Sequence, residues 1–193
     1  MKKKNYYVHE SSIIDKNVKI GKNSKIWHFS HIQSDAIIGK NCSLGQNVNI
    51  SKNVKIGNNV KIQNNVSVYE GVELDDYVFC GPSMVFTNIL NPRSEFPQNN
   101  PNDFLKTIVR KSVSIGANAT ILCGVEIGQY ALIGAGAVIT KNVPSFALIV
   151  GNPGRRVGWV DKKGKRLNFS KSGVSACGKF ILEDKKVKML DNN

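Results

Sequence analysis

The side chains of this sequence that could do chemistry are mainly amides, with few bases or thiols placed to act together. The histidines are His9, His28 and His31. The four cysteines, at positions 42, 80, 123 and 177, lie far apart and form no CxxC pair, so they do not have the spacing of a zinc site. We therefore expect a site that requires no metal.

Amide and small residues recur at an interval of 18. One series runs through His28, Gln46, Asn64 and Pro82, and its neighbour runs through Phe29, Asn47, Asn65 and Ser83. Further along, the pair Gly116-Ala117 is followed at the same interval by Gly134-Ala135. Such series form straight columns if the elements that carry them repeat with the same period.

A six-residue repeat predicts such elements. Every sixth residue from Val8 to Phe86 is apolar, and a second six-residue series holds small or β-branched residues almost throughout. A period of six fits neither a helix nor a simple strand, but it suits a short strand followed by a turn. Three units make one triangular coil, which matches the interval of the columns, and coils stack at about 4.8 Å. The sequence therefore predicts an all-β parallel β-helix.

The repeat pauses once. It stops after Phe86 and resumes in a new phase at Val109, giving about twenty hexads, or between six and seven coils. Segment 87–108 contains three prolines and several asparagines, and we interpret it as an inserted loop on the binding face, against the alternative of a tolerated surface insertion. We expect a β-helix domain over residues 1–150 and a small C-terminal cap or tail over 151–193.

Composition excludes several classes. The net charge is +13, but lysine and asparagine are spread over turn positions without interleaved aromatics, so we expect a solvated surface that attracts phosphorylated ligands rather than a nucleic-acid-binding protein. No apolar run is as long as a membrane-spanning helix requires, so no membrane span is expected. No secretory leader follows the basic N-terminus, which makes a cytoplasmic location the expectation.

These repeats, with Gly-Asn-Pro-Gly at 151–154, resemble the bacterial hexapeptide-repeat acyltransferases. The resemblance implies a left-handed β-helix, a homotrimer and acetyl-CoA bound in a groove between subunits. Segments 26–32, 44–48, 61–69, 81–88 and 91–93 are more specifically similar to the nucleotide-sugar 3-N-acetyltransferases. That subgroup acetylates the 3-amino group of a UDP- or dTDP-linked sugar, such as UDP-2-acetamido-3-amino-glucuronate or a dTDP-3-amino-3,6-dideoxyhexose, for surface glycan synthesis.

The histidines do not fit the role of a general base. The insertion and the later glycine-rich coils place acyl transfer near Asn88, and His28 lies three coils below Pro82, about 14 Å along the axis. A sugar hydroxyl needs such a base, whereas a sugar amine is partly unprotonated near neutral pH, so the sequence favours N-acetylation. By resemblance, Asn88 matches the residue that orients the amine, which attacks the thioester directly without an acyl-enzyme. The alternative for Asn88 is a turn residue at the start of the loop.

The predicted acceptor site combines the amide columns with residues near the insertion. The candidates are Gln46, Asn64, Asn65, Tyr69, Phe86 and Arg93. The aromatics could pack on a base or sugar ring, and the guanidinium could pair with a diphosphate or a sugar carboxylate. The alternatives are a structural amide ladder and coil packing, the latter strongest for Phe86 on its inward position.

For the cofactor, close approach of the backbone requires small residues. We predict that Gly116, Ala117, Gly134 and Ala135 contact the pantetheine and that Lys141 and Arg155 contact the phosphates. The alternative is that the small residues only form tight corners.

Two other functions stay open: an O-acetyltransferase of the same fold and a non-catalytic β-helix scaffold. A γ-type carbonic anhydrase requires three histidine ligands, and the pair His28 and His31 fits this poorly. The sequence does not choose between UDP and dTDP, identify the sugar or the glycan pathway, assign the tail, or say whether His28 or His31 contacts substrate.

Overall fold

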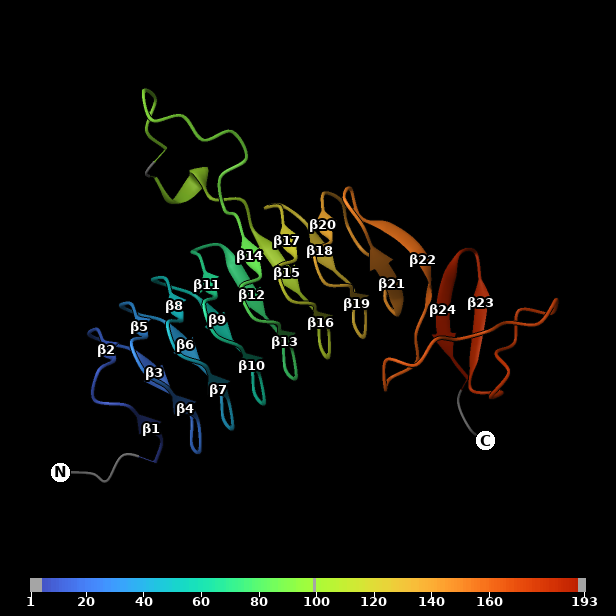
Figure 1. Cartoon of the computed structure of the whole chain (residues 1–193), viewed down its shortest axis with the longest axis horizontal. Helices are drawn as coiled ribbons and strands as arrows, with labels where there is room; N and C mark the ends of the chain where they lie inside the picture. Colours follow the sequence, from blue (N-terminus) through green and yellow to red (C-terminus); the bar gives the residue numbers. More distant parts are fainter. Residues whose placement is uncertain (1–4, 99, 191–193) are drawn as a thin grey trace.

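The computed structural model describes residues 5–98 and 100–190, and this part of the chain forms a left-handed parallel β-helix with three sheets (Figure 1), which confirms the predicted fold. Sheet A contains β1 (Tyr7–Val8), β4 (Lys25–Ile26), β7 (Ser43–Leu44), β10 (Lys61–Ile62), β13 (Phe79–Cys80), β16 (Ser114–Ile115), β19 (Leu132–Ile133) and β21 (Ala147–Val150). Sheet B contains β2 (Ile13–Ile14), β5 (His31–Ile32), β8 (Asn49–Ile50), β11 (Ser67–Val68), β14 (Val85–Phe86), β17 (Thr120–Ile121) and β20 (Val138–Ile139). Sheet C contains β3 (Lys19–Ile20), β6 (Ile37–Ile38), β9 (Lys55–Ile56), β12 (Val72–Leu74), β15 (Thr107–Val109) and β18 (Glu126–Ile127).

Each strand stacks on the strand one coil away. Lys25 pairs with Ser43, and Ser43 pairs with Lys61, in parallel register at an interval of 18. Above the insertion, Ser114 pairs with Leu132 in the same way. The predicted columns of stacked residues are therefore real, and they run along the edges where two sheets meet.

The repeat works because each position of the hexad has one environment. The second residue of nearly every strand points into the prism and is buried, as with Ile26, Ile50 and Ile121. The small residue before each strand lies at the corner, where Ser24 is buried and its hydroxyl donates to the Gly39 carbonyl at 2.8 Å. The turns adopt positive φ, more often at asparagine than at any other residue type, because asparagine accepts this conformation more readily than most residues. The asparagines concerned are Asn17, Asn23, Asn41, Asn47, Asn53, Asn59, Asn65 and Asn118.

Sheet A holds eight parallel strands, more than the six to seven coils predicted from the hexad count. The additional strand is β21, which pairs with β19 through Leu132 and Leu148. The hexad count missed it because the chain between those two partners is shorter than three full hexads and includes Pro144.

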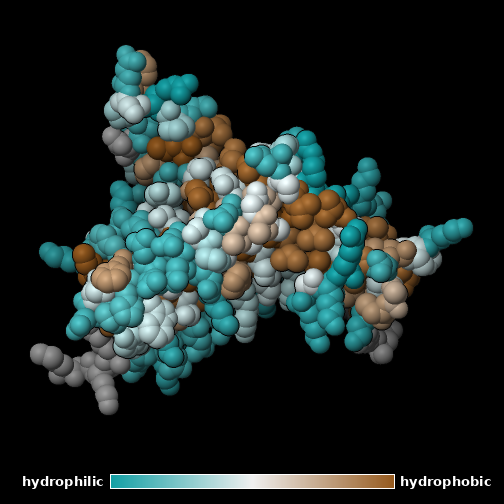
Figure 2. Space-filling model, in the orientation of Figure 1, coloured by the Kyte–Doolittle hydropathy of each residue, from teal (hydrophilic) through white to brown (hydrophobic). Residues whose placement is uncertain are grey.

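The chain between β14 and β15 leaves the β-helix and projects away from it (Figure 1). Its described part holds one short 3-10 turn, η1 (Pro101–Asp103). The two ends of the loop are tied together, since the Leu105 amide donates to the Asn88 carbonyl at 2.9 Å. Leu90 and Phe96 remain 57% and 67% exposed, and apolar surface also gathers over the C-terminal coils (Figure 2). The loop therefore exposes apolar side chains that the β-helix of the same chain does not cover.

The C-terminal part continues the core beyond the last coil. β22 (Arg155–Trp159) pairs antiparallel with β21, and β23 (Phe180–Glu183) pairs antiparallel with β24 (Lys186–Met189). Trp159, Leu167 and Phe180 belong to the same hydrophobic cluster as the coils. Within residues 5–98 and 100–190, no helix is long and apolar enough to cross a lipid bilayer.

Candidate active site

The predicted site residues lie on two different edges of the prism. The edge between sheets A and B carries Gln46, Asn64, Asn65, Gly116, Ala117, Gly134 and Ala135, because each follows a sheet A strand. The edge between sheets B and C carries Tyr69, Asn88 and Lys141, because each follows a sheet B strand. Within one chain, sheet B separates the two sets.

On the A–B edge, the lower amides hold the corners in place. Asn64 Oδ1 accepts a hydrogen bond from the Gln46 backbone amide at 3.0 Å, and Asn47 Nδ2 donates to Asn65 Oδ1 at 3.0 Å. The structural ladder that the sequence left as an alternative is thus present. Its side chains still line the surface, since Gln46, Asn64 and Asn65 are exposed.

Higher on the same edge, glycines take the position that residues with side chains occupy in most lower coils. Gly81, Gly116 and Gly134 stack directly above one another. Their backbones lie so close that a Cβ on Gly116 would collide with the Ala135 nitrogen and one on Gly81 would lie 2.6 Å from the Ala117 nitrogen. This column, here called the glycine floor, is bounded by the exposed or half-buried Ala117 and Ala135. A ligand can therefore approach the backbone closely at this height.

Only some backbone groups of the glycine floor are available. The amides of Gly116 and Gly134 donate to the carbonyls of Ile133 and Ile149 at 2.8 Å. The Ala117 and Ala135 amides have no acceptor among the described residues. In a lower coil the equivalent amide, that of Gln46, is capped by a side chain of the coil above, but alanine has no side chain that can accept. The free donors are thus on the alanines rather than the glycines.

Asn88 sits at the root of the projecting loop on the B–C edge. Its Nδ2 donates to the Glu70 carbonyl at 3.4 Å, and no described residue donates to its Oδ1. Asn88 is half-buried, and Tyr69, one residue before Glu70, is 39% exposed. The Glu70 side chain is held by Lys52 at 3.4 Å and Asn53 at 2.8 Å, so it stabilises this corner. Glu70 was absent from the sequence prediction, which had no means of placing it beneath Asn88 before the coil register was known.

Two predicted acceptor residues have different outcomes. Phe86 is 0% exposed and packs in the core, so the prediction that it contacts substrate is wrong, because its strand position points into the prism. Arg93 is exposed in the loop, lining a hollow with Ile89 and Pro97, and its Nη1 donates to the Pro92 carbonyl at 3.4 Å. Only the second side chain can reach a ligand.

A basic cavity of about 190 Å³ lies at the upper end of the β-helix. Lys141, Arg155 and Arg156 line it with Asn142 and Gly154. The structure therefore brings together the two cations that the sequence proposed for phosphate binding, and adds Arg156, which was not predicted. Arg156 also lies over the Trp159 ring at 4.4 Å.

The histidines gather at the opposite end. The His9 and His28 rings lie 3.5 Å apart between centroids, and His31 Nε2 contacts Asp15 Oδ1 at 3.0 Å. None of them lies in the coils that carry the glycine floor or Asn88. The described residues also contain no group of three or more His, Cys, Asp or Glu side chains that could hold a metal.

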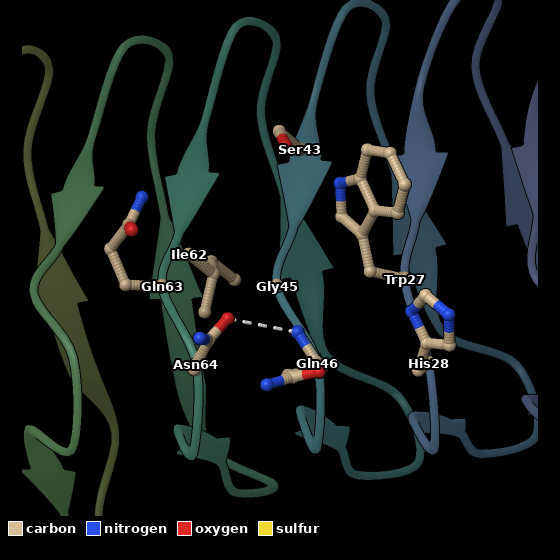
Figure 3. Close-up of a pocket in the computed structure, with 8 residues that line it drawn as sticks. All are labelled: Trp27, His28, Ser43, Gly45, Gln46, Ile62, Gln63 and Asn64. Carbon is tan, nitrogen blue, oxygen red and sulfur yellow. Dashed lines mark hydrogen bonds between the residues drawn. The ribbon is translucent and has the colours of Figure 1, made fainter.

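A slot on the lower A–B edge is lined by the predicted residues Gln46 and Asn64 and also by Trp27, Gly45 and Gln63, which the sequence prediction missed (Figure 3). Trp27, Gly45 and Gln63 succeed one another at an interval of 18, so two long side chains flank a position that has none. The cavity measures about 400 Å³, and its other lining residues are His28, Ser43, Gln46, Ile62 and Asn64. We call it the Gly45 slot. The alternation of large, absent and large side chains in this column could have revealed it.

Comparison with known proteins places these repeats. The bacterial transferase hexapeptide model (six repeats) matches residues 17–52 and 106–141, and the model for the hexapeptide repeat of succinyl-transferase matches residues 36–70. Over 80 residues the chain is 46% identical to dTDP-3-amino-3,6-dideoxy-alpha-D-galactopyranose 3-N-acetyltransferase of Aneurinibacillus thermoaerophilus, covering 41% of this chain and 42% of that protein. Over 60 residues it is 42% identical to serine acetyltransferase of Buchnera aphidicola, covering 31% and 23%. The chain thus matches less than half the length of these relatives.

Solved structures agree on the fold. A variant of GDP-perosamine N-acetyltransferase from Caulobacter crescentus, in complex with CoA and GDP-perosamine, aligns with a TM-score of 0.54 and 19% identity over 78% of this chain and 55% of that one. The acetyltransferase domain of PglB from Neisseria gonorrhoeae, in complex with acetyl coenzyme A, aligns with a TM-score of 0.52 and 17% identity over 79% and 58%. By its repeats, the chain is similar to the bacterial transferase hexapeptide family over residues 17–52 and 106–141, and its β-helix architecture agrees with that similarity.

Proposed function

We propose that this protein is an acetyl-CoA-dependent N-acetyltransferase that acetylates the 3-amino group of a nucleotide-linked sugar. The observation that carries the proposal is the glycine floor with the free amides of Ala117 and Ala135 beside it, which lies at the height of Asn88 and away from every histidine. An amine acceptor needs orientation more than a base, and this arrangement offers orientation. The 46% identity to a dTDP-amino-sugar 3-N-acetyltransferase supports the same acceptor class.

The acetyl donor fits along the A–B edge. The Ala117 and Ala135 amides can donate to the amide carbonyls of a pantetheine arm, because the glycine floor lets the arm lie against the backbone. The cavity with Lys141, Arg155 and Arg156 supplies three cations for phosphates, and a second copy of the chain would bring this cavity beside the A–B edge that holds the pantetheine. These positions suit a long ligand with an anionic end.

A homotrimer explains why the site is split between two edges. A neighbouring copy can bring its B–C edge, with Asn88 and the loop, against the A–B edge of the first chain at equal height. Sheet B presents no lysine, arginine or carboxylate on its outward positions, although the chain carries a net charge of +13. Those outward residues are Ile13, His31, Asn49, Ser67, Val85, Thr120 and Val138. The exposed Leu90 and Phe96 of the loop would be covered by the same contact.

The proposed reaction follows from how Asn88 is held. Its Nδ2 is tied to the Glu70 carbonyl, so Oδ1 is free to accept a hydrogen bond from the acceptor amine and to aim the nitrogen lone pair at the thioester carbonyl. The C–N bond forms, the C–S bond breaks, and the proton lost from nitrogen ends on the departing CoA thiolate. Arg93, exposed in the loop, can pair with the diphosphate or a sugar carboxylate. We further propose a cytoplasmic enzyme of surface glycan synthesis, with UDP- and dTDP-linked amino sugars as the acceptors to test.

An acetyl-CoA consumption assay with UDP-3-amino-glucuronate and dTDP-3-amino-6-deoxyhexose acceptors tests the proposal. We expect one acceptor class to be acetylated, and Asn88→Ala to lower kcat about 100-fold because the amine is no longer aimed. His9→Ala, which changes a side chain remote from Asn88, is the matched control and should retain activity. Equal activity in both variants would remove Asn88 from the mechanism, and no acetylation of either acceptor would reject the function.

A further inference from the structure

We propose that the Gly45 slot binds the pyrimidine base of the nucleotide-linked acceptor. The inference rests on the proposed function and names the part of the substrate that the lower coils recognise. It begins from the column of Trp27, Gly45 and Gln63, in which the middle position has no side chain (Figure 3).

The width of the slot suits one planar ring. Trp27 and Gln63 lie two coils apart, or about 9.6 Å between backbones. A ring stacked between two flat groups needs about 7 Å between their planes, so a single ring fits and a pair does not. Trp27 is 38% exposed, which leaves its indole face available for stacking. A Cβ at Gly45 would lie 2.8 Å from the Asn64 backbone nitrogen, so a side chain there would force the Asn64 corner to shift.

The polar rim matches the edge of uracil or thymine. The side-chain amides of Gln46 and Gln63 have no hydrogen-bond partner among the described residues, and both line the slot. A primary amide offers one acceptor beside two donors, which complements an imide N–H flanked by carbonyl oxygens. The slot therefore favours the two pyrimidines that share this edge.

The surrounding charges suit the diphosphate that follows the base. Ser43 lies between Lys25 and Lys61 on the outward face of sheet A, beside the slot. No carboxylate among the described residues pairs with either lysine. Lys61 lies on the side of the slot nearer the glycine floor, so a ligand leaving the slot upward passes this cation.

The height of the slot agrees with the position of acyl transfer. From Gly45 to Gly81 and Gly116 is two to three coils, or about 10–14 Å. A ribose and an extended diphosphate span this distance between a base and its sugar. The adenine of CoA is the competing planar ring, but the cations for its phosphates lie at the far end, with Lys141 and Arg155. The pyrimidine is therefore the occupant that fits.

Tryptophan fluorescence tests binding directly. The chain has two tryptophans, and Trp159 is buried, so Trp159→Phe leaves Trp27 as the single reporter. We expect saturable quenching by UDP or dTDP and none by CoA or inorganic pyrophosphate at the same concentration. Quenching by CoA instead, or by no nucleotide, would overturn the proposal.

Steady-state kinetics separates this proposal from the proposed function. Trp27→Ala should raise KM for the nucleotide sugar at least about tenfold, with KM for acetyl-CoA and kcat nearly unchanged. Phe29→Ala is the matched control, because Phe29 is 69% exposed two residues away and does not line the slot. Robust acetylation with identical KM values in both variants would refute base binding in the Gly45 slot but would still support the N-acetyltransferase function. Quenching by UDP without any acetylation would support nucleotide binding in the Gly45 slot and refute the N-acetyltransferase function.

Discussion

Asn88 shows how a single residue can be held by structure and still be available for chemistry. One end of its amide is fixed by the Glu70 carbonyl one coil below, and the other end has no partner in the described chain. The same division recurs at Asn64, whose Oδ1 caps Gln46 while the side chain stays exposed. At the residue scale, a corner amide therefore stabilises the coil and lines the surface together.

The cysteines give a prediction at this scale. Burial raises the pKa of Cys80 to about 12, and burial also raises the pKa of Cys42. A hydrogen bond with Ser175 lowers the pKa of the exposed Cys177, so its reactive thiolate forms at a lower pH. We expect one fast-reacting thiol with DTNB at pH 8 in the native protein, and four after unfolding in guanidinium.

The control for that experiment is Cys177→Ser, which should abolish the fast phase and leave three thiols on unfolding. Rapid labelling of a second thiol in this variant would show that Cys42, Cys80 or Cys123 is reachable, contrary to their burial.

At the scale of the element, each corner depends on one residue with positive φ. Asn59 adopts a φ of 58°, and its side chain makes no hydrogen bond within the described residues. Its contribution is therefore conformational, since most residues with a side chain disfavour the left-handed region.

We expect Asn59→Ala to lower the free energy of unfolding by about 1 kcal/mol, whereas Asn59→Gly should be close to neutral. Lys40→Ala, on the same edge but without positive φ, should change stability by less than about 0.5 kcal/mol. Urea unfolding followed by circular dichroism checks all three. A glycine variant as unstable as the alanine variant would assign the effect to the lost amide instead.

Elements also mark what the sequence could predict. The strands from β1 to β20 follow from a six-residue spacing, because each position has one environment that admits few residue types. β21 escaped the count because its coil is shorter than three hexads, and the path of the inserted loop has no repeat to fix it. The columns at Gln46 and Gly116 were predictable from the interval alone. The division of the site between two edges was not, since it depends on which sheet each corner follows.

At the scale of the whole molecule, three faces of one prism differ in character. Sheet C presents Lys19, Lys55, Glu73 and Glu126 outward, whereas sheet B presents uncharged side chains and His31. Charged groups are depleted from the centres of protein interfaces, so sheet B is the face that a second copy would cover.

If the proposed trimer forms, we expect Val85→Lys, on sheet B, to shift it toward monomers and to lower activity, because an ammonium group would be buried in the contact. Ile37→Lys is the matched control on sheet C, where the side chain is similarly exposed, at 40% against 46%. Sedimentation velocity and the acetylation assay measure both effects. A Val85→Lys variant that sediments like the control would exclude sheet B as the contact face.

The stacking of coils also means that axial distances between corner residues change only in whole coils. Gly45 and Gly81 are separated by two complete coils, so their distance can lengthen or shorten only by about 4.8 Å at a time without disturbing every column above. Removing one whole coil would bring Gly45 and Gly81 closer by about 4.8 Å and keep all later side chains on their own edges. Chains that bind shorter or longer ligands can thus be designed by removing or adding whole coils, with Gly45 and Gly81 left unchanged.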